Sequence, residues 1–467
     1  MKNFKYAVLT LTVFGGAVAS GAAWAAQPAS GAVSTAALIQ RLEDLEQEVA
    51  LLKRQLEVQK EIEDKKAVES PVITANANNG FSIKSPDDAF KLRIGGYLQT
   101  DARLFTDNDK SSAAAGTTDT FTMRRIRPTF EGTVAKNFDF RIMPSFDQGT
   151  AALQDAYLDY RYAPELKFRA GRFKSPFGLE RLQSNATTSF VETAYPTGLT
   201  PNYDIGFQVF GDVQQGVVSY AVALANGTSD GAASDTDTNN DKEIAARLMF
   251  SPFKLTNNEL LRGLSAGAAV THGHKEGTGV LPTLRSPGQA SIFSYASGVF
   301  ADGPHTRLSP QLSWYYGQFG LLSEYVTSDQ QLSRGAFQDK FENRAWQIAG
   351  TYVITGEDAS PKGVTPLKNF DPAAGTWGAW EIAGRYHELD VDDSIFTGYP
   401  NGTFANASSA VSDAASWTIG TNWYLSKNLR LQFDFEHTEF SGGNFLNGAF
   451  ADRPDENAVL SRFQLAY

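Results

Sequence analysis

The stretch AVLSRFQLAY, residues 458–467, alternates between two kinds of side chain and ends on an aromatic ring. Phe463, Leu465 and Tyr467 share one face of an extended strand, whereas Arg462 and Gln464 lie on the other. An outer-membrane barrel strand needs an apolar face toward lipid, a polar face toward the lumen and an aromatic side chain at the interface. The stretch therefore predicts a barrel strand. A half-buried strand of a soluble protein can alternate in the same way, so the rest of the chain has to decide.

The first residues, 1–25, have the pattern of a secretory signal peptide. Lys2 and Lys5 precede an apolar stretch, residues 6–18, and residues 23–25 form an A-x-A cleavage site. The apolar stretch is too short for a membrane-spanning helix. From Ala26 onward there is no run of about twenty apolar residues, which excludes a helical membrane protein. We expect an exported protein.

The composition fits a barrel and excludes several functions. Glycine is abundant at 41 residues and aromatic residues reach 12%, as turn-rich strands with aromatic girdles require. There is no cysteine, and the formal net charge of −11 argues against a nucleic-acid partner. No metalloprotease or phosphate-loop motif occurs, and the five histidines show no convincing metal spacing. We expect no catalytic residue, no metal and no cofactor, although some outer-membrane barrels are enzymes.

After a linker at residues 26–35, the stretch 36–66 has a heptad pattern. Apolar residues recur at alternating steps of four and three, and charged residues occupy the other positions. This predicts a coiled coil, and a single amphipathic helix lying on its own barrel is the alternative. A polar linker is expected at residues 67–80. The apolar series consists of Leu38, Leu42, Leu45, Val49, Leu52 and Leu56.

Residues 81–467 show a period of two. The clearest case is residues 429–436, where Leu and Phe alternate with Arg, Gln, Asp and Glu. Similar segments begin near Lys91, Phe121, Phe138, Leu153, Leu166, Tyr203, Val217, Ile244, Leu264, Arg307, Phe319, Ala345 and Trp380, with a short one near Leu281. Sixteen to eighteen strands result, with about sixteen as the expected number, enough for an aqueous channel. The fold class is an all-β, transmembrane antiparallel β-barrel. A soluble propeller is the alternative, but no blade-length repeat is found.

The parity of each strand directs many arginines into the lumen. Guanidinium groups bind oxyanions and stay charged at any cellular pH, so such a lumen attracts anions. The alternative is that each arginine pairs with a nearby acid and only stiffens the wall. The inward arginines include Arg125, Arg127, Arg141 and Arg169.

Two features near the lumen need separate treatment. By parity Arg124 lies on the lipid face, where an arginine costs about 2 to 4 kcal/mol, so either a bulge turns it inward or it lies at a protomer contact. The segment from Lys174 to Tyr203 is long enough to be a functional loop and contains Glu180 and Arg181. We expect it to be the constriction loop, with an ordinary outer loop as the alternative.

Several strings occur in a recognisable order: FTMRRIRPTFEG (121–132), AGRFKSPFGLE (170–180), YVITGE (352–357), GAWEIAGRYHELDVDD (378–393), IGTNWYLSKNLRLQFDF (419–435) and RFQLAY (462–467). Together they resemble the phosphate-selective porin family, the outer-membrane porins O and P. The resemblance implies a trimer of sixteen-stranded barrels, an inward-folded third loop and a ladder of lumenal arginines. It matches Arg124 and Arg125 to the family's paired arginines, and Arg181 to its basic residue after FGLE.

Two positions depart from the family pattern. Tyr97, in IGGYLQTD, stands where the phosphate-specific members have an arginine, and Asp139 replaces an expected lysine. The candidate pore-lining and anion-binding residues are Arg124, Arg125, Arg127, Arg141, Arg169 and Arg181, and those of the constriction loop are Lys174, Glu180 and Arg181.

The sequence thus predicts an outer-membrane porin of a Gram-negative cell with a periplasmic N-terminal helix. We expect a water-filled channel for passive diffusion of small solutes and ions, with a preference for anions such as phosphate or polyphosphate. The alternatives are a non-selective diffusion porin and a barrel enzyme. The expected partners are outer-membrane lipid, two further copies of the chain in a homotrimer and small anions.

Overall fold

The computed structural model describes residues 34–76, 80–106, 118–233, 237, 239–276, 281–398 and 402–467. The predicted signal peptide, and all but the end of the linker that follows it, lie outside the described residues. The chain divides between Val68 and Glu69 into two compact units. Among the described residues, no helix combines the length and the apolar character needed to cross a bilayer.

The first unit contains helix α1 (Thr35–Glu69). It has no proline or glycine, and Pro71 follows two residues after its end, as expected for a helix that stops there. The apolar series predicted from the heptads is exposed along its whole length, from 49% at Val49 to 65% at Leu56. A helix is therefore confirmed over residues 36–66 and extends to Glu69. Its pairing with other chains stays a prediction.

The stretch predicted to be a polar linker, residues 67–80, contains regular secondary structure in its described residues. After α1 ends, strand β1 (Val72–Asn76) pairs with β2 (Gly80–Lys84), which pairs in turn with the start of β3. The β-branched residues Val72, Ile73 and Thr74 favour an extended chain, and β2 offers them an edge to pair with. The polar composition of this stretch does not indicate these short strands.

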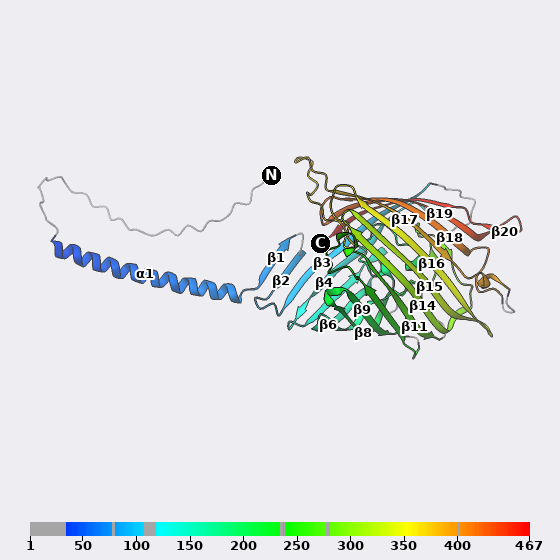
Figure 1. The fold of residues 1–467 in the computed structure, drawn as a ribbon, viewed down its shortest axis with the longest axis horizontal. Helices are drawn as coiled ribbons and strands as arrows, with labels where there is room; N and C mark the ends of the chain where they lie inside the picture. Colours follow the sequence, from blue (N-terminus) through cyan, green and yellow to red (C-terminus); the bar gives the residue numbers. More distant parts are fainter. Residues whose placement is uncertain are drawn as a thin grey trace. The chain divides into compact units, whose positions relative to one another are not determined.

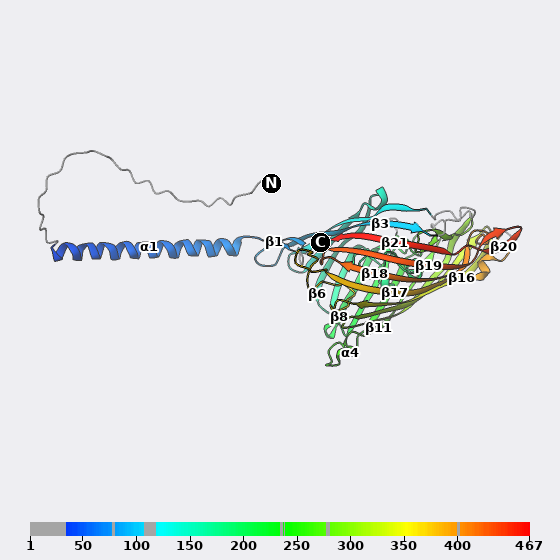
Figure 2. The same ribbon diagram turned by 90° about the horizontal axis from the view of Figure 1, so that it is seen from above.

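Sixteen strands of the described chain form a closed antiparallel barrel. Figures 1 and 2 show neighbouring strands running side by side and tilted around it. The barrel strands are β3 (Lys91–Phe105), β4 (Thr120–Val134), β5 (Phe138–Ser145), β6 (Ala152–Ala163), β7 (Leu166–Lys174), β8 (Tyr203–Val213), β9 (Val218–Ala225), β10 (Glu243–Phe250), β11 (Ser265–Lys275), β14 (Val299–Tyr316), β15 (Phe319–Arg334), β16 (Phe337–Val353), β17 (Ala379–Asp390), β18 (Val411–Tyr424), β19 (Leu429–Leu446) and β21 (Glu456–Ala466).

The remaining elements belong to connections. They are α2 (Leu179–Leu182), α3 (Tyr195–Gly198), α4 (Glu259–Arg262), β12 (Leu284–Arg285), β13 (Ser291–Phe293), β20 (Ala449–Asp452) and three short 3₁₀ turns at Asp147–Gly149, Gln214–Gly216 and Asp393–Phe396. The short strand expected near Leu281 is not a wall strand, because β12 and β13 pair only with each other. Strands β14 and β16 begin eight residues before their predicted starts. Most of the eight additional residues of each strand are polar or small, and they lack the regular apolar alternation.

The two faces of the wall follow the predicted parity. On β19, Arg430 and Asp434 are buried toward the lumen at 2% exposure each, whereas Phe433 and Phe435 are exposed on the outside at 45% and 36%. The barrel thus has a polar interior and an apolar exterior, the reverse of a soluble domain.

The last strand closes the barrel against the first. Strand β21 pairs with β3 from Ala458 opposite Phe105 to Ala466 opposite Tyr97 (Figure 2). At this seam Arg462 donates two hydrogen bonds of 2.7 Å to Asp101, and both residues are 1% exposed. A bidentate pair without access to solvent fixes the register of the seam as well as its contacts.

Replacing Asp101 by Asn should strongly destabilise the barrel, because it leaves the Arg462 guanidinium buried without its counter-charge. Breaking one partner of such a pair costs about 3 to 5 kcal/mol. The matched control is Asp139→Asn, since Asp139 pairs with Arg161 where both side chains are 35% or more exposed. That pair is worth at most about 1 kcal/mol. Denaturant unfolding of the purified protein in detergent measures both, and equal effects would contradict the expectation.

Candidate functional site

The connection between β7 and β8, residues 175–202, folds into the barrel. It carries α2 and α3, and Phe177, Val191 and Leu199 within it are at most 1% exposed. A loop that stayed outside the barrel would leave these side chains in water. The segment predicted to be the constriction loop is therefore placed inside the lumen.

Backbone groups of this loop bond to strands far away in the sequence. Leu179 N and Glu180 N donate to the Glu324 carboxylate of β15, at 2.6 and 3.1 Å. Val191 N donates to Asp434 of β19 at 2.6 Å. Similar bonds join Asn185 O to Gln99 of β3, Glu192 O to Arg385 of β17 and Thr188 O to Arg430 of β19. The loop crosses the lumen from β7 to the opposite wall.

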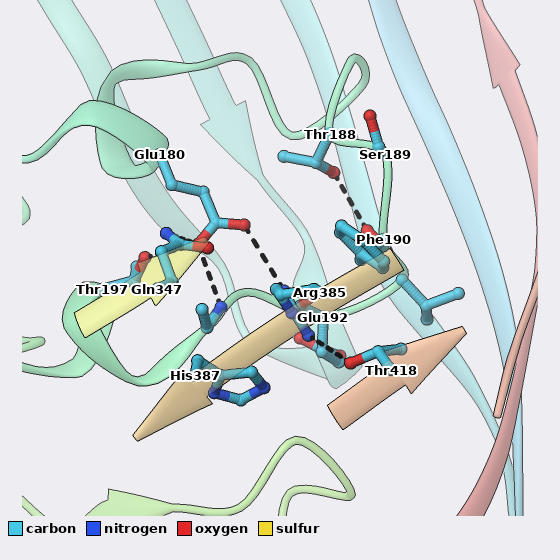
Figure 3. A network of polar contacts seen from close by, with 12 residues as sticks. Glu180, Thr188, Ser189, Phe190, Glu192, Thr197, Gln347, Arg385, His387 and Thr418 are labelled. Atoms are coloured by element: carbon cyan, nitrogen blue, oxygen red, sulfur yellow. Dashed lines mark hydrogen bonds and ion pairs between the residues drawn. The ribbon is translucent and has the colours of Figure 1, made fainter. Parts of the chain in front are cut away.

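Glu180 lies at the centre of a network that connects the two halves of the loop (Figure 3). Its Oε2 accepts hydrogen bonds from Ala194 N at 2.9 Å, from the Thr197 hydroxyl at 3.0 Å and from the Gln347 amide at 3.1 Å. Arg385 lies 3.6 Å from its other oxygen. A buried carboxylate with four such neighbours is held in one orientation.

Arg124 turns into the lumen at a β-bulge. The β3–β4 register shifts between Gln99 opposite Arg125 and Thr100 opposite Met123, which leaves Arg124 as the extra residue. Its Nε and Nη2 donate to the two oxygens of Glu192 at 2.7 and 3.1 Å. Burial opposes the charge of Glu192, but Arg124 outweighs it and holds the pKa of this loop carboxyl well below its usual range. Of the two explanations left open by parity, the bulge is the one observed.

Three of the predicted lumenal arginines are neutralised by wall acids. Arg127 contacts Asp147 at 2.5 Å, Arg169 contacts Asp159 at 2.7 Å, and Arg141 lies between two acids. Those two acids are Glu131, at 2.9 Å, and Asp155, at 3.0 Å. For these positions the arginine ladder is a series of ion pairs.

Arg125, Lys174 and Arg181 differ from the paired arginines. Arg125 donates to the Gln99 side-chain oxygen at 3.0 Å, and Lys174 donates to the carbonyls of Arg181 and Gln183 at 2.7 and 2.8 Å. Arg181 donates to the Thr200 hydroxyl at 2.9 Å and to the Thr197 carbonyl. Among the described residues, no carboxylate makes an ion pair with any of the three.

The three groups also lie within electrostatic range of one another. Lys174 interacts with Arg125 and Arg181, and all three lie near Arg127. Burial lowers the pKa of the loop residue Arg181 to about 10, so it remains charged at neutral pH. The three cations also lie within electrostatic range of the carboxylates of Glu192, Asp155, Glu180 and Glu324, although none of these acids forms an ion pair with them.

The loop lies between two cavities. One, of about 410 Å³, lies toward the short turns and includes Lys174, residues 182–185 of the loop, and the aromatic rings of Tyr157 and Phe210. The other, of about 450 Å³, lies toward the long connections and includes Arg124, Arg181 and residues 192–198 of the loop. Solute that passes from one side to the other must pass the loop.

The two positions that depart from the family pattern occupy different places. Tyr97 borders the first cavity and accepts a hydrogen bond from Arg127 at 3.2 Å. Asp139 is 2.6 Å from Arg161 and accepts from the Thr133 hydroxyl at 2.7 Å. Tyr97 thus faces the path, whereas the charge of Asp139 is compensated by an arginine.

Several important residues were not identified from the sequence. Glu324, Gln347 and Asp434 hold the loop, yet each lies more than 140 residues after the loop residue that it contacts. No local motif marks them. Asp241, His274 and Glu276 bring ligand atoms within 4.8 Å of one another, the kind of group that could hold a metal ion. They are at the ends of β10 and β11 and take no part in the constriction.

The comparisons with known proteins agree with this architecture. The family model of phosphate-selective porin O and P matches residues 92–467. The outer membrane channel DcaP of Acinetobacter baumannii superposes with a TM-score of 0.51 at 15% identity, over 82% of this chain and 99% of that chain. A loop-deletion mutant of OmpT, an outer membrane protein of Vibrio cholerae, gives 0.50 at 10% identity, over 81% and 100%. No curated protein sequence matches the chain.

Replacing Glu192 by Gln should increase the preference for anions, because Arg103 and Arg124 both lose the carboxylate that they share. The loop backbone stays attached through Arg385 and Asp434. We expect the anion-to-cation permeability ratio, from reversal potentials in a KCl gradient, to rise about twofold as the local potential becomes more positive.

The matched control is Asp159→Asn, which frees Arg169 in the wall, away from Arg181, and should give a smaller rise. An unchanged ratio in Glu192→Gln would show that Arg124 does not contribute to the field of the path.

Proposed function

The chain belongs to the phosphate-selective porin O and P family, and we propose that its channel passes small anions in preference to cations. Family and fold together make it an outer-membrane porin with a water-filled pore. The observation that carries the anion preference is the group Arg125, Lys174 and Arg181, which has no carboxylate partner in the described chain. Rings or clusters of such groups select anions in pores.

The negative net charge of the whole chain does not oppose this proposal. Many lumenal acids are already paired with arginines, as Asp147, Asp155 and Asp159 are. A pore selects by the potential at its narrowest part, where low-dielectric walls focus the field of nearby charges. We propose that Arg181 and Lys174, which belong to or bind the loop inside the lumen, lie at that part and make the local potential positive.

On this geometry phosphate is a weakly held solute. Guanidinium forks such as Arg181 match the oxygen atoms of phosphate, and buried sites strengthen each contact. Tyr97, however, offers a neutral hydroxyl where a phosphate-specific relative has a cation. We propose a transient phosphate site, and the non-selective diffusion porin is the alternative. Family and fold favour a channel over an enzyme, and we propose no catalytic activity.

Arg181→Ala should weaken phosphate block of the chloride current. One charge-assisted contact contributes about 1.5 to 3 kcal/mol, so the affinity should fall about tenfold or more. Tyr97→Arg should have the opposite effect, because it adds a second guanidinium beside Arg127. Phosphate titration of single channels in a planar bilayer measures both.

Arg161→Ala is the control, since its side chain is 43% exposed and binds Asp139. Block of the native channel by micromolar phosphate would contradict the weak site. A cation-selective reversal potential at low salt would exclude the anion preference itself.

We also propose that three copies of the chain associate and that their α1 helices form a coiled coil in the periplasm. The support is the apolar series from Leu38 to Leu56, whose side chains are exposed on α1. An exposed heptad series is the surface that a second and third helix would cover. The number three comes from the family resemblance.

Deletion of residues 36–66 should leave the barrel inserted in the membrane and lower the thermal stability of the oligomer. On this proposal the helix contributes contacts between copies of the chain. Heat-modified migration on gels, recorded across a temperature series, measures the oligomer and the barrel separately. Leu45→Ser with Leu52→Ser is the milder variant and should act in the same direction. An unchanged melting temperature of the oligomer in both variants would refute the coiled coil.

A further inference from the structure

Glu324 is a buried acid of the wall that holds the loop, and the proposed anion preference does not depend on its charge. It lies on β15 at 2% exposure, and its carboxylate accepts three hydrogen bonds. Two come from the backbone N–H groups of Leu179 and Glu180, at 2.6 and 3.1 Å. The third comes from the side-chain amide of Gln347, at 2.8 Å. All three partners are donors, as an ionised carboxylate requires.

Gln347 connects this wall acid to the second half of the loop. It lies directly opposite Glu324 in the β15–β16 pairing and is fully buried. Its amide also donates to Glu180, whose carboxylate in turn holds Ala194 and Thr197 (Figure 3). One neutral amide therefore separates two buried acids and satisfies both.

Glu324 and Gln347 together form a clamp that holds the loop backbone at Leu179 and Glu180. The next residue of the loop is Arg181. Its backbone carbonyl accepts the Lys174 ammonium at 2.7 Å, and its side chain bonds to Thr197 and Thr200. The position of both cations therefore depends on the backbone of residues 179–181. We propose that Glu324, acting with Gln347, is a positioning residue that holds Arg181 and Lys174 in the path and thereby sets the ion preference of the pore. This inference rests on the proposed anion preference.

Because Glu324 is negatively charged, the direction in which its neutralisation changes the anion preference tests the inference. If Glu324 acted only through its negative charge, its neutralisation would make the pore more attractive to anions. If it positions the loop, Glu324→Gln replaces one of the two carboxylate oxygens that accept from the backbone N–H groups by an amide donor, and Arg181 leaves its place. The preference for anions then falls although a negative charge has been removed.

The experiment compares three variants of the full-length protein in planar bilayers under a KCl gradient. Glu324→Gln should lower the anion-to-cation permeability ratio about twofold and increase the open-channel current noise, because a loosened loop moves in the current path. Gln347→Ala keeps the charge unchanged and should act in the same direction. Glu131→Gln is the matched control, because it removes a lumenal negative charge that binds Arg93 and Arg141 and does not touch the loop.

Glu131→Gln should raise the ratio without added noise. A rise in the ratio with a quiet current in Glu324→Gln, as in the control, would overturn the positioning role. If Glu324→Gln does not assemble, Gln347→Ala decides alone, and quiet current with an unchanged ratio refutes the inference. If the native channel shows no anion preference, the proposed function fails, whereas the current noise of the two variants still decides whether the clamp holds the loop.

Discussion

The structure depends on one constraint: no backbone N–H or C=O can remain unpaired in lipid. An open sheet of sixteen strands would have two such edges, and only closure removes them. Strand β21 meets β3 for this reason, and the buried pair of Arg462 and Asp101 stabilises that register. Closure makes the wall's inner face a confined polar surface. Every charge on that face then needs a partner in the wall, in a loop or in the water of the pore.

The constriction loop is shaped by the same need. A segment of about thirty residues that enters a barrel brings backbone groups that must find hydrogen bonds away from bulk water. Strands β15, β17 and β19 provide them through Glu324, Arg385 and Asp434. The loop is thus held by two acids, Glu324 and Asp434, and by one arginine, Arg385. The two carboxylates keep their negative charge, but they bind backbone N–H groups of the loop.

The sequence was sufficient to predict the structure wherever the alternation of side chains along a strand decides which face a residue occupies. The alternation along β19 and β21 predicted the lipid and lumen faces correctly, and the number of strands agrees with sixteen. It was insufficient where a single residue breaks the period. The bulge at Arg124 reverses its face, and no local pattern distinguishes that bulge from a lipid-facing arginine. The partners of the loop were also beyond reach, because Glu324 meets Leu179 only after the barrel has closed.

The number of arginines in the lumen therefore overestimates the positive field of this pore. Arg127, Arg141 and Arg169 contribute little net field because each has an acid within about 3 Å, and such close pairs act at a distance as dipoles. Arg125, Lys174 and Arg181 are fewer, yet their hydrogen bonds go to carbonyls, hydroxyls and an amide, which hold the side chains without cancelling their charge. An anion can exchange with water at such groups and displace no carboxylate. On the proposed function, the selectivity of this lumen is set by the cations that form no ion pair with an acid.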